Sequence, residues 1–302
     1  MKVLVVGHRG MLAQALILCL QRAGLTALSQ GRPVLDITQA ESTQKALAAL
    51  KPDMVINAAA YTAVDQAESE KAQAFAVNRD GAAHVADVCQ EIGVPLIHIS
   101  TDYVFDGTVR RPYREEDSPA PLGVYGESKW QGEVAVRVRH REHLIVRTAW
   151  VYSSQGHNFL NTMLRLARER TVLRVVNDQY GCPTWSWDLA MALVTMCQRI
   201  MQDRGLVPWG TYHCCGAGQT TWYDFAQSII KAAQAFEPLK VREIVPIPTT
   251  AYPTPAQRPA NSVLDCAKVR TVFGITPRPW QESVQDCIQE VYTNRPTPPA
   301  MS

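Results

Sequence analysis

The sequence predicts an α/β protein built on a doubly wound parallel sheet, followed by a second, smaller α/β domain. Three observations favour this fold. Short apolar runs alternate with longer amphipathic stretches from the first residue on, their spacing suits parallel strands joined by helices, and the pattern changes after Trp150. The length of 302 residues agrees with one large domain or two.

Five apolar runs in the first half of the chain are each short enough to form a buried parallel strand. They are Val3–Val6, Leu25–Leu28, Met54–Asn57, Leu96–Ile99 and Leu144–Arg147. The amphipathic stretches between them predict helices over Met11–Ala23, Thr38–Leu50 and about residues 70–92. Thr38, followed by Glu41 three residues later, is typical of a helix N-cap.

The change of pattern after Trp150 indicates the second domain. Helices are expected over Asn158–Arg170, residues 188–201 and Trp222–Phe236, and strands over Leu173–Val176 and Tyr212–Cys215. Five prolines between Pro246 and Pro259 exclude a continuous helix or an inner strand and predict a structured loop. We therefore predict a first domain of residues 1–155 with a returning segment of about 185–215, a second domain of residues 156–184 and 216–294, and a flexible tail of residues 295–302.

Composition excludes several classes of protein. Lysine plus arginine total 30 and aspartate plus glutamate 28, so the net charge of +2 does not support a nucleic-acid or membrane partner held by bulk charge. Hydrophobic residues at 46% and charged residues at 19% exclude disorder as the main state. No apolar run approaches the ~20 residues of a membrane helix, and the run Val3–Val6 is too short for a signal peptide. We therefore expect a cytoplasmic protein.

The cysteines and histidines do not predict a metal site. The eight cysteines form no CxxC pair and no Cys/His zinc spacing. Buried reduced thiols are favoured over four disulfides in a large chain of intracellular character. The seven histidines show neither HExxH nor HxH spacing.

A glycine-containing loop lies between the first predicted strand and the first predicted helix. Its sequence from residue 7 is Gly-His-Arg-Gly-Met-Leu-Ala, a GxxGxxA pattern. Small residues let the backbone approach a pyrophosphate, whose charge is stabilised by the helix N-terminus. The alternative is a tight strand-to-helix turn without a ligand. In this position the loop favours a Rossmann-type dinucleotide-binding domain, with cofactor contacts at Gly7, Arg9, Gly10, Met11 and Leu12.

The end of the second predicted strand bears on the choice of dinucleotide. NAD sites usually place an acid ~20 residues after the glycines, where it holds the ribose hydroxyls. Here that region reads Leu-Ser-Gln-Gly-Arg over residues 28–32, with no acid and one guanidinium, that of Arg32. Arg9 adds a second positive charge, although either arginine is also compatible with a solvated surface position. The sequence favours NADPH over NADH.

Polar residues at two places predict a catalytic centre. Ser100 and Thr101 follow the strand Leu96–Ile99, at the sheet edge where ligands bind in α/β folds. Tyr125 and Lys129 are four residues apart, so they share one face of a helix. A nearby ammonium lowers a phenol pKa, and a decrease of about 2–3 requires about 3–4 kcal/mol of differential stabilisation. Taken alone, the YxxxK pair is also compatible with a surface helix.

These motifs together resemble the extended short-chain dehydrogenase/reductase superfamily, and within it the family of the dTDP-4-dehydrorhamnose reductases. The resemblance rests on GxxGxxA, on YxxxK, and on the segments NAAAY from Asn57 and STDYVFDG from Ser100. Further family-like segments make the match run nearly from end to end. They are residues 57–70 (NAAAYTAVDQAESE), 144–152 (LIVRTAWVY), 177–184 (NDQYGCPT) and 251–262 (AYPTPAQRPANS).

The resemblance implies an oxidoreductase that transfers hydride from NADPH or NADH to C4 of dTDP-4-dehydro-L-rhamnose, giving dTDP-L-rhamnose for cell-surface polysaccharides. Tyr125 would donate the proton, Lys129 would bind the nicotinamide ribose and lower the tyrosine pKa, and Thr101 would bind the 4-oxo oxygen. Further cofactor contacts would come from Asp36, Ile37, Ala58, Ala59, Ala60, Tyr61 and Ser100. Sugar-nucleotide contacts would come from Thr62, Val64, Asp102, Tyr103 and Trp150, with Arg258 as a diphosphate partner.

The sequence departs from this family at a metal site. Some members hold Mg²⁺ at a dimer contact through three glutamates, and the matching positions here are Ala15, Trp187 and Glu290. A hard divalent cation needs several oxygen ligands, so no metal site of that kind is expected. The dimer that the metal would bridge becomes doubtful, which leaves a monomer or a weak homodimer.

Three alternatives stay open at this point. A 4,6-dehydratase would resemble Thr-Asp-Glu, whereas residues 101–103 read Thr-Asp-Tyr. An epimerase, or another 4-oxo sugar-nucleotide reductase, would use the same catalytic residues. The chain also resembles, more distantly, the regulatory subunit of methionine adenosyltransferase, which acts by binding. The presence of Thr101, Tyr125 and Lys129 favours catalysis.

Overall fold

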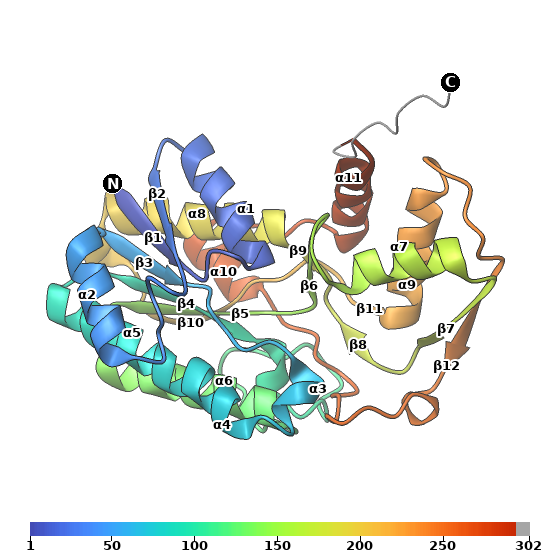
Figure 1. Ribbon diagram of the computed structural model, residues 1–302, viewed down its shortest axis with the longest axis horizontal. Coiled ribbons are helices and arrows are strands. Elements are labelled where there is room, and N and C mark those ends of the chain that lie inside the picture. Colours follow the sequence, from blue (N-terminus) through green and yellow to red (C-terminus); the bar gives the residue numbers. More distant parts are fainter. Residues whose placement is uncertain (294–302) are drawn as a thin grey trace.

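A six-stranded parallel sheet forms the centre of the larger part of the molecule (Figure 1). The computed structural model describes residues 1–293, so the predicted tail lies outside the described residues. The strand order is β10-β5-β4-β3-β1-β2, and every neighbouring pair is parallel. The strands are β1 (Lys2–Val6), β2 (Thr26–Gln30), β3 (Met54–Asn57), β4 (Leu96–Thr101), β5 (His143–Thr148) and β10 (Gly210–His213).

Helices cover both faces of this sheet, as the alternating pattern predicts (Figure 1). One face packs against α1 (Met11–Arg22), α8 (Ser186–Gln202) and α10 (Ala267–Phe273). The other face packs against α2 (Ala40–Leu50), α5 (Gly81–Ile92) and α6 (Val124–Arg139). The short helices α3 (Val64–Ala67) and α4 (Lys71–Phe75) precede a π-helical turn over Ala76–Asp80, which leads directly into α5.

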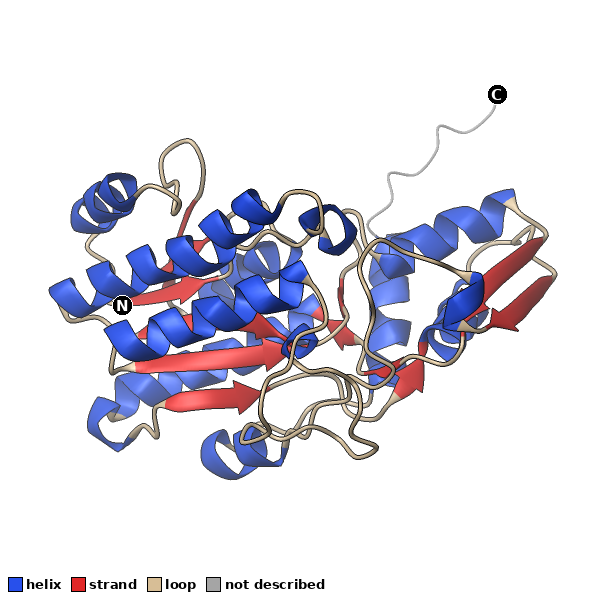
Figure 2. Cartoon of the chain, turned by 90° about the horizontal axis from the view of Figure 1, so that it is seen from below, coloured by secondary structure: helices blue, strands red, loops and turns tan. Residues whose placement is uncertain are grey.

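A smaller unit with its own hydrophobic core lies beside the carboxyl ends of the sheet strands (Figure 2). Its helices are α7 (Phe159–Glu169), α9 (Trp222–Ala233) and α11 (Trp280–Thr293), packed with the parallel pair β7 (Val172–Val176) and β12 (Glu243–Ile247). Two short strand pairs accompany it: β6 (Val151–Tyr152) with β9 (Thr184–Trp185), and β8 (Tyr180–Gly181) with β11 (Thr220–Thr221). Single 3₁₀ turns occupy Asp102–Val104, Arg204–Leu206 and Thr249–Ala251.

The structure confirms the predicted strands and long helices and corrects three details. Thr38 does not cap α2, because its hydroxyl donates to Asp36 Oδ1 (2.7 Å) and the N-cap is Gln39. The proline-rich loop begins later than predicted, since Pro246 lies within β12. That strand tolerates proline because its sheet has only two strands and therefore no inner one.

The third correction concerns the domain division. Residues 216–294 do not all pack with the smaller unit, because Val269 and Phe273 of α10 belong to the hydrophobic core of the large sheet. The chain therefore returns to the sheet between α9 and α11. This return is invisible in the hydrophobic pattern, which gives the buried face of a helix but not its partner.

All eight cysteines are free thiols, and seven of them are buried. This agrees with the predicted reduced state. Among the described residues, no helix combines the length and the hydropathy that a membrane span requires.

Candidate active site

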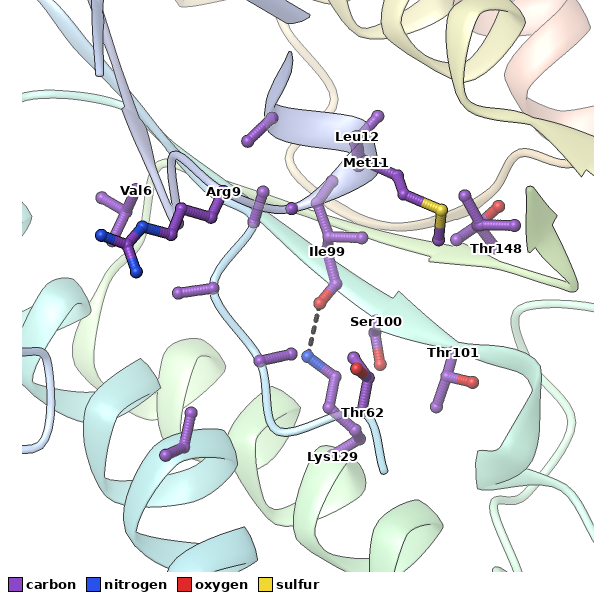
Figure 3. Close-up of a pocket in the computed structure, with 18 of the residues that line it drawn as sticks. Val6, Arg9, Met11, Leu12, Thr62, Ile99, Ser100, Thr101, Lys129 and Thr148 are labelled. Carbon is purple, nitrogen blue, oxygen red and sulfur yellow. Dashed lines mark hydrogen bonds between the residues drawn. The ribbon is translucent and has the colours of Figure 1, made fainter. Parts of the chain in front are cut away.

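A cavity of about 810 Å³ lies at the carboxyl ends of the sheet strands. It is located between β1 and β3, where the order of the strands in the sheet reverses. Ligands of doubly wound folds bind at this point. The cavity brings together every predicted site residue except Tyr61 and Arg258. Figure 3 shows that the loop before α1, the end of β4 and helix α6 supply its walls.

The loop after β1 has the geometry of a phosphate cradle. Gly7 has φ +101°, and a Cβ atom there would lie 2.8 Å from the backbone nitrogen of Ala59, so only glycine fits. Helix α1 begins after Gly10 with no side-chain cap and no acidic residue in its first turn. Its first N–H groups are therefore free to bind an anion. This loop fits the pyrophosphate of a dinucleotide.

The far end of the cavity is lined by Gly31, Arg32, Asp36 and Ile37. Asp36 Oδ1 accepts hydrogen bonds from the backbone N–H of Thr38 (3.0 Å) and from its hydroxyl, so the carboxylate is held in place. Arg32 and Arg9 are exposed, and neither guanidinium pairs with a carboxylate of the described residues. Two free positive charges beside an adenosine site suit a ribose 2′-phosphate.

Lys129 reaches from α6 into the floor of the cavity. The residue is only 2% exposed, and its Nζ atom donates to the carbonyl oxygen of Ile99 at 2.6 Å (Figure 3). Burial lowers the Lys129 pKa to about 8, and the negative charge of Glu133 opposes that decrease. The ammonium is therefore charged at neutral pH and loses its proton above about pH 8.

Tyr125 lies one helical turn before Lys129 and lines the same cavity. Burial raises the pKa of its phenol to about 12, while a hydrogen bond with Thr101 lowers it and the charge of Asp102 raises it. Burial is the largest contribution to this pKa, and the Lys129 ammonium donates to the carbonyl oxygen of Ile99, so the lowering of the Tyr125 pKa by Lys129 stays a prediction. Tyr125 is consequently a protonated phenol at neutral pH.

Thr101 and Asp102 stand at the end of β4 beside Tyr125. The Thr101 hydroxyl donates to Asp102 Oδ1 (3.0 Å) and accepts from the backbone N–H of Tyr103 (3.2 Å). Asp102 is 2% exposed, and burial raises its carboxyl pKa to about 7. The Tyr103 and Tyr125 rings meet edge to face, with centroids 5.8 Å apart. A hydroxyl, a carboxyl and a phenol thus converge on one small region.

A buried ion cluster centred on Glu133 adjoins the site, and the sequence analysis did not predict it. Glu133 (0% exposed) accepts bonds from Ser100 Oγ (2.6 Å), from Arg147 Nε (2.9 Å) and Nη2 (2.8 Å), and from Arg137 Nη2 (2.6 Å). It ties helix α6 to the ends of β4 and β5. Two signals in the sequence pointed to it: Glu133 follows Lys129 by four residues, and Arg147 interrupts an otherwise apolar strand.

Two predicted site residues lie outside the cavity. Tyr61 directs its hydroxyl to Glu70 Oε2 (2.9 Å), and its backbone is held by the side chain of Asn78, which also donates to Ser128 Oγ on α6 (2.9 Å). Arg258 forms a two-pronged ion pair with Asp65 (2.6 and 2.8 Å), which lowers the Asp65 pKa. Each side chain has a partner that is close in space and that the sequence alone does not reveal.

Two of the three positions that the resemblance assigns to a metal site, Ala15 and Trp187, carry side chains without a ligand oxygen. Ala15 is buried on α1, and the Trp187 ring lies under the Arg22 guanidinium at 4.6 Å. Within residues 1–293, no three histidine, cysteine, aspartate or glutamate side chains cluster so as to hold a metal ion.

Comparison with known proteins supports the fold and gives the relatives of this chain. The family model described as RmlD substrate binding domain matches residues 1–293. The dTDP-4-dehydrorhamnose reductase of Sinorhizobium fredii is 42% identical over 94% of this chain and 96% of its own length. A reductase of that name from Clostridium acetobutylicum has a solved structure with a TM-score of 0.89 and 34% identity, covering 96% of this chain and 99% of that one. The Bacillus anthracis reductase, solved in complex with NADP, gives a TM-score of 0.87 and 35% identity, with the same coverage of both chains.

Proposed function

This chain belongs to the RmlD substrate binding domain family, and on that premise we propose that it reduces dTDP-4-dehydro-L-rhamnose to dTDP-L-rhamnose with NADPH. The observation that carries the proposal is the convergence of Thr101, Tyr125 and Lys129 in one cavity beside an uncapped helix N-terminus. An oxidoreductase of the short-chain dehydrogenase type needs this set of groups and this anion site.

Some of the cavity residues would bind the cofactor, and others would donate a proton to the substrate or orient its carbonyl oxygen. The loop Gly7–Met11 would hold the pyrophosphate, and Lys129 the nicotinamide ribose. When it is bound, reduced nicotinamide supplies the hydride. Tyr125, protonated because its pKa is about 12, donates its proton to the carbonyl oxygen as that oxygen gains negative charge. Thr101 orients this oxygen by a hydrogen bond.

The other predicted contacts are part of the same proposal. Ser100, Asp36, Ile37 and the alanines at 58–60 line the cofactor side of the cavity, and Thr62, Val64, Asp102, Tyr103 and Trp150 line the sugar side. Arg258 would bind the diphosphate only by exchanging its Asp65 partner for phosphate oxygens. Tyr61 would support the cofactor loop without touching the cofactor, because it lies outside the cavity and its backbone pairs with Asn78.

We also propose the organisation and setting of the protein. The sheet unit binds the dinucleotide, the smaller unit covers the sugar nucleotide, and the chain acts in the cytoplasm as a monomer or weak homodimer. The small charge of +2 supports a partner list of small molecules, without nucleic acid or membrane.

The central test is a direct assay. Purified protein is mixed with NADPH and dTDP-4-dehydro-L-rhamnose, and the absorbance of the reduced nicotinamide is followed. We expect oxidation of NADPH that depends on the sugar nucleotide. Intact NADPH binding without any oxidation would contradict the reductase and favour a regulatory binding protein.

Replacing Arg32 with alanine should weaken the preference for NADPH. The guanidinium is exposed, so its contact with a 2′-phosphate is worth about 1 kcal/mol, or about fivefold in kcat/KM. The value of kcat/KM for NADH should stay unchanged, as should both values in Arg174→Ala, which removes an exposed arginine outside the cavity. An equal decrease in kcat/KM with NADPH and with NADH would show that Arg32 does not bind the 2′-phosphate.

Chelation should leave the enzyme active. The glutamates that hold Mg²⁺ in some relatives are replaced by Ala15 and Trp187, and a divalent cation needs several oxygen ligands. We expect the same kcat with and without excess EDTA. A loss of activity that added Mg²⁺ restores would contradict this expectation.

A further inference from the structure

Trp222 lines the cavity from the smaller unit. Among the described residues after Asn158, only Trp222 lines it. It is the first residue of α9, in the smaller unit. Its ring stacks on Trp150 with centroids 3.4 Å apart and an interplanar angle of 6°. The two indoles therefore form a face-to-face stack across the boundary between the two units.

Trp150 has an uncommon backbone conformation. Its φ is +47°, in the left-handed region that bulky residues rarely adopt. The ring lies against Gly181, where a Cβ atom would come within 2.3 Å of Trp150 Cε2. Trp150 is thus held in a slot between Gly181 and Trp222. Backbone strain of this kind persists only where the surroundings impose it, and it occurs most often at ligand sites.

The orientation of Trp222 is itself fixed. Its Nε1–H donates to Gln179 Oε1 (3.1 Å), and Gln179 Nε2 donates to Thr249 Oγ1 (3.0 Å). Gln179 is 7% exposed, and the Phe159 ring packs on Trp222 at 4.6 Å. The Trp222 ring therefore cannot turn away from Trp150 without breaking a buried hydrogen bond.

We propose that Trp222 is a positioning residue for the sugar subsite: by stacking face to face on Trp150 it holds that indole at the cavity, where the deoxyhexose meets the edges of the two rings. The inference rests on the proposed function and extends it to a residue outside the predicted site. A 6-deoxy sugar offers a methyl group for apolar contact with the rings and oxygen atoms that suit their electropositive edges. The dinucleotide, held by the loop of Gly7 and by Lys129, does not need this pair of rings.

The test uses the full chain with Trp222→Ala and Trp222→Phe, and Trp209→Ala as the matched control. Trp209 is a half-buried tryptophan that packs on the core of the large sheet and does not line the cavity. For Trp222→Ala we expect KM for the sugar nucleotide to rise about tenfold, which corresponds to about 1.4 kcal/mol. The Kd of NADPH should stay within twofold. Trp222→Phe should restore part of the KM, and Trp209→Ala should leave it unchanged.

Circular dichroism gives an independent measurement. Two stacked indoles couple, so the far-ultraviolet couplet should weaken in Trp222→Phe, which leaves the more distant pair Trp185 and Trp187, and stay unchanged in Trp209→Ala. A sugar KM equal to that of the wild type in both Trp222 variants would overturn the proposal, even if the melting temperature fell. Equal weakening of NADPH and sugar would overturn it as well. Failure of the wild type to oxidise NADPH would instead contradict the proposed function.

Discussion

Tyr125→Phe is expected to lower kcat by about 10²–10⁴-fold, the usual contribution of a positioned general acid. The variant loses only the hydroxyl whose proton the new alkoxide needs. The remaining ring keeps its edge-to-face contact with Tyr103, at 5.8 Å, so the cavity should hold its shape. The Kd of NADPH, measured by fluorescence titration, should change less than twofold.

Tyr180→Phe is the matched control for this experiment. Tyr180 is an exposed tyrosine that does not line the cavity, so its hydroxyl should not affect kcat. If Tyr125→Phe lost NADPH affinity as strongly as it lost turnover, the hydroxyl would be binding the cofactor, and the proton donor would have to be sought among Thr101 and Asp102. Asp102 is the second candidate because its pKa is raised to about 7.

Glu133→Gln is expected to destabilise the protein by about 3–5 kcal/mol, because it leaves the buried Arg147 guanidinium without its counter-charge. The measurement is the free energy of unfolding from urea titration. Glu127→Gln, at a half-buried carboxylate of the same helix whose hydrogen bond from Gln131 the amide oxygen can keep, should change that free energy by less than about 0.5 kcal/mol. The double variant Glu133→Gln/Arg147→Met should recover part of the loss, since it removes both charges. Equal stability of the two single variants would refute this account.

Glu133→Gln should also shift the pH dependence of NADPH binding. Burial holds the Lys129 pKa at about 8, below its ordinary 10.5, and the Glu133 charge opposes this decrease. Between pH 8 and 10.5 the unfolded chain binds more protons than the folded one at this group, so Lys129 makes stability rise with pH in that window. Without Glu133 the pKa falls further. The alkaline limb of NADPH binding should therefore shift to lower pH in Glu133→Gln and stay in place in Glu127→Gln.

The local pattern was sufficient for the fold and for the centre of the site. Five of the six strands of the sheet were predicted from apolar runs, because a buried parallel strand needs such a run wherever it lies. The sixth, β10, was predicted two residues late, as Tyr212–Cys215. The loop of Gly7 and the pair Tyr125 and Lys129 were also predicted from the sequence. The positive φ of Gly7 and the four-residue spacing on a helix are both properties of residues close to one another in the sequence.

The tertiary structure decided what depends on segments distant in the sequence. Arg258 meets Asp65 across 193 residues, which removes it from the cavity that it was expected to line. Glu133 and Arg147 pair only because α6 crosses β5, and Trp222 reaches Trp150 only because the smaller unit packs against the sheet. Propensity and periodicity describe one segment at a time. Which charge a buried carboxylate pairs with, and which rings line the cavity, is determined by how those segments pack together.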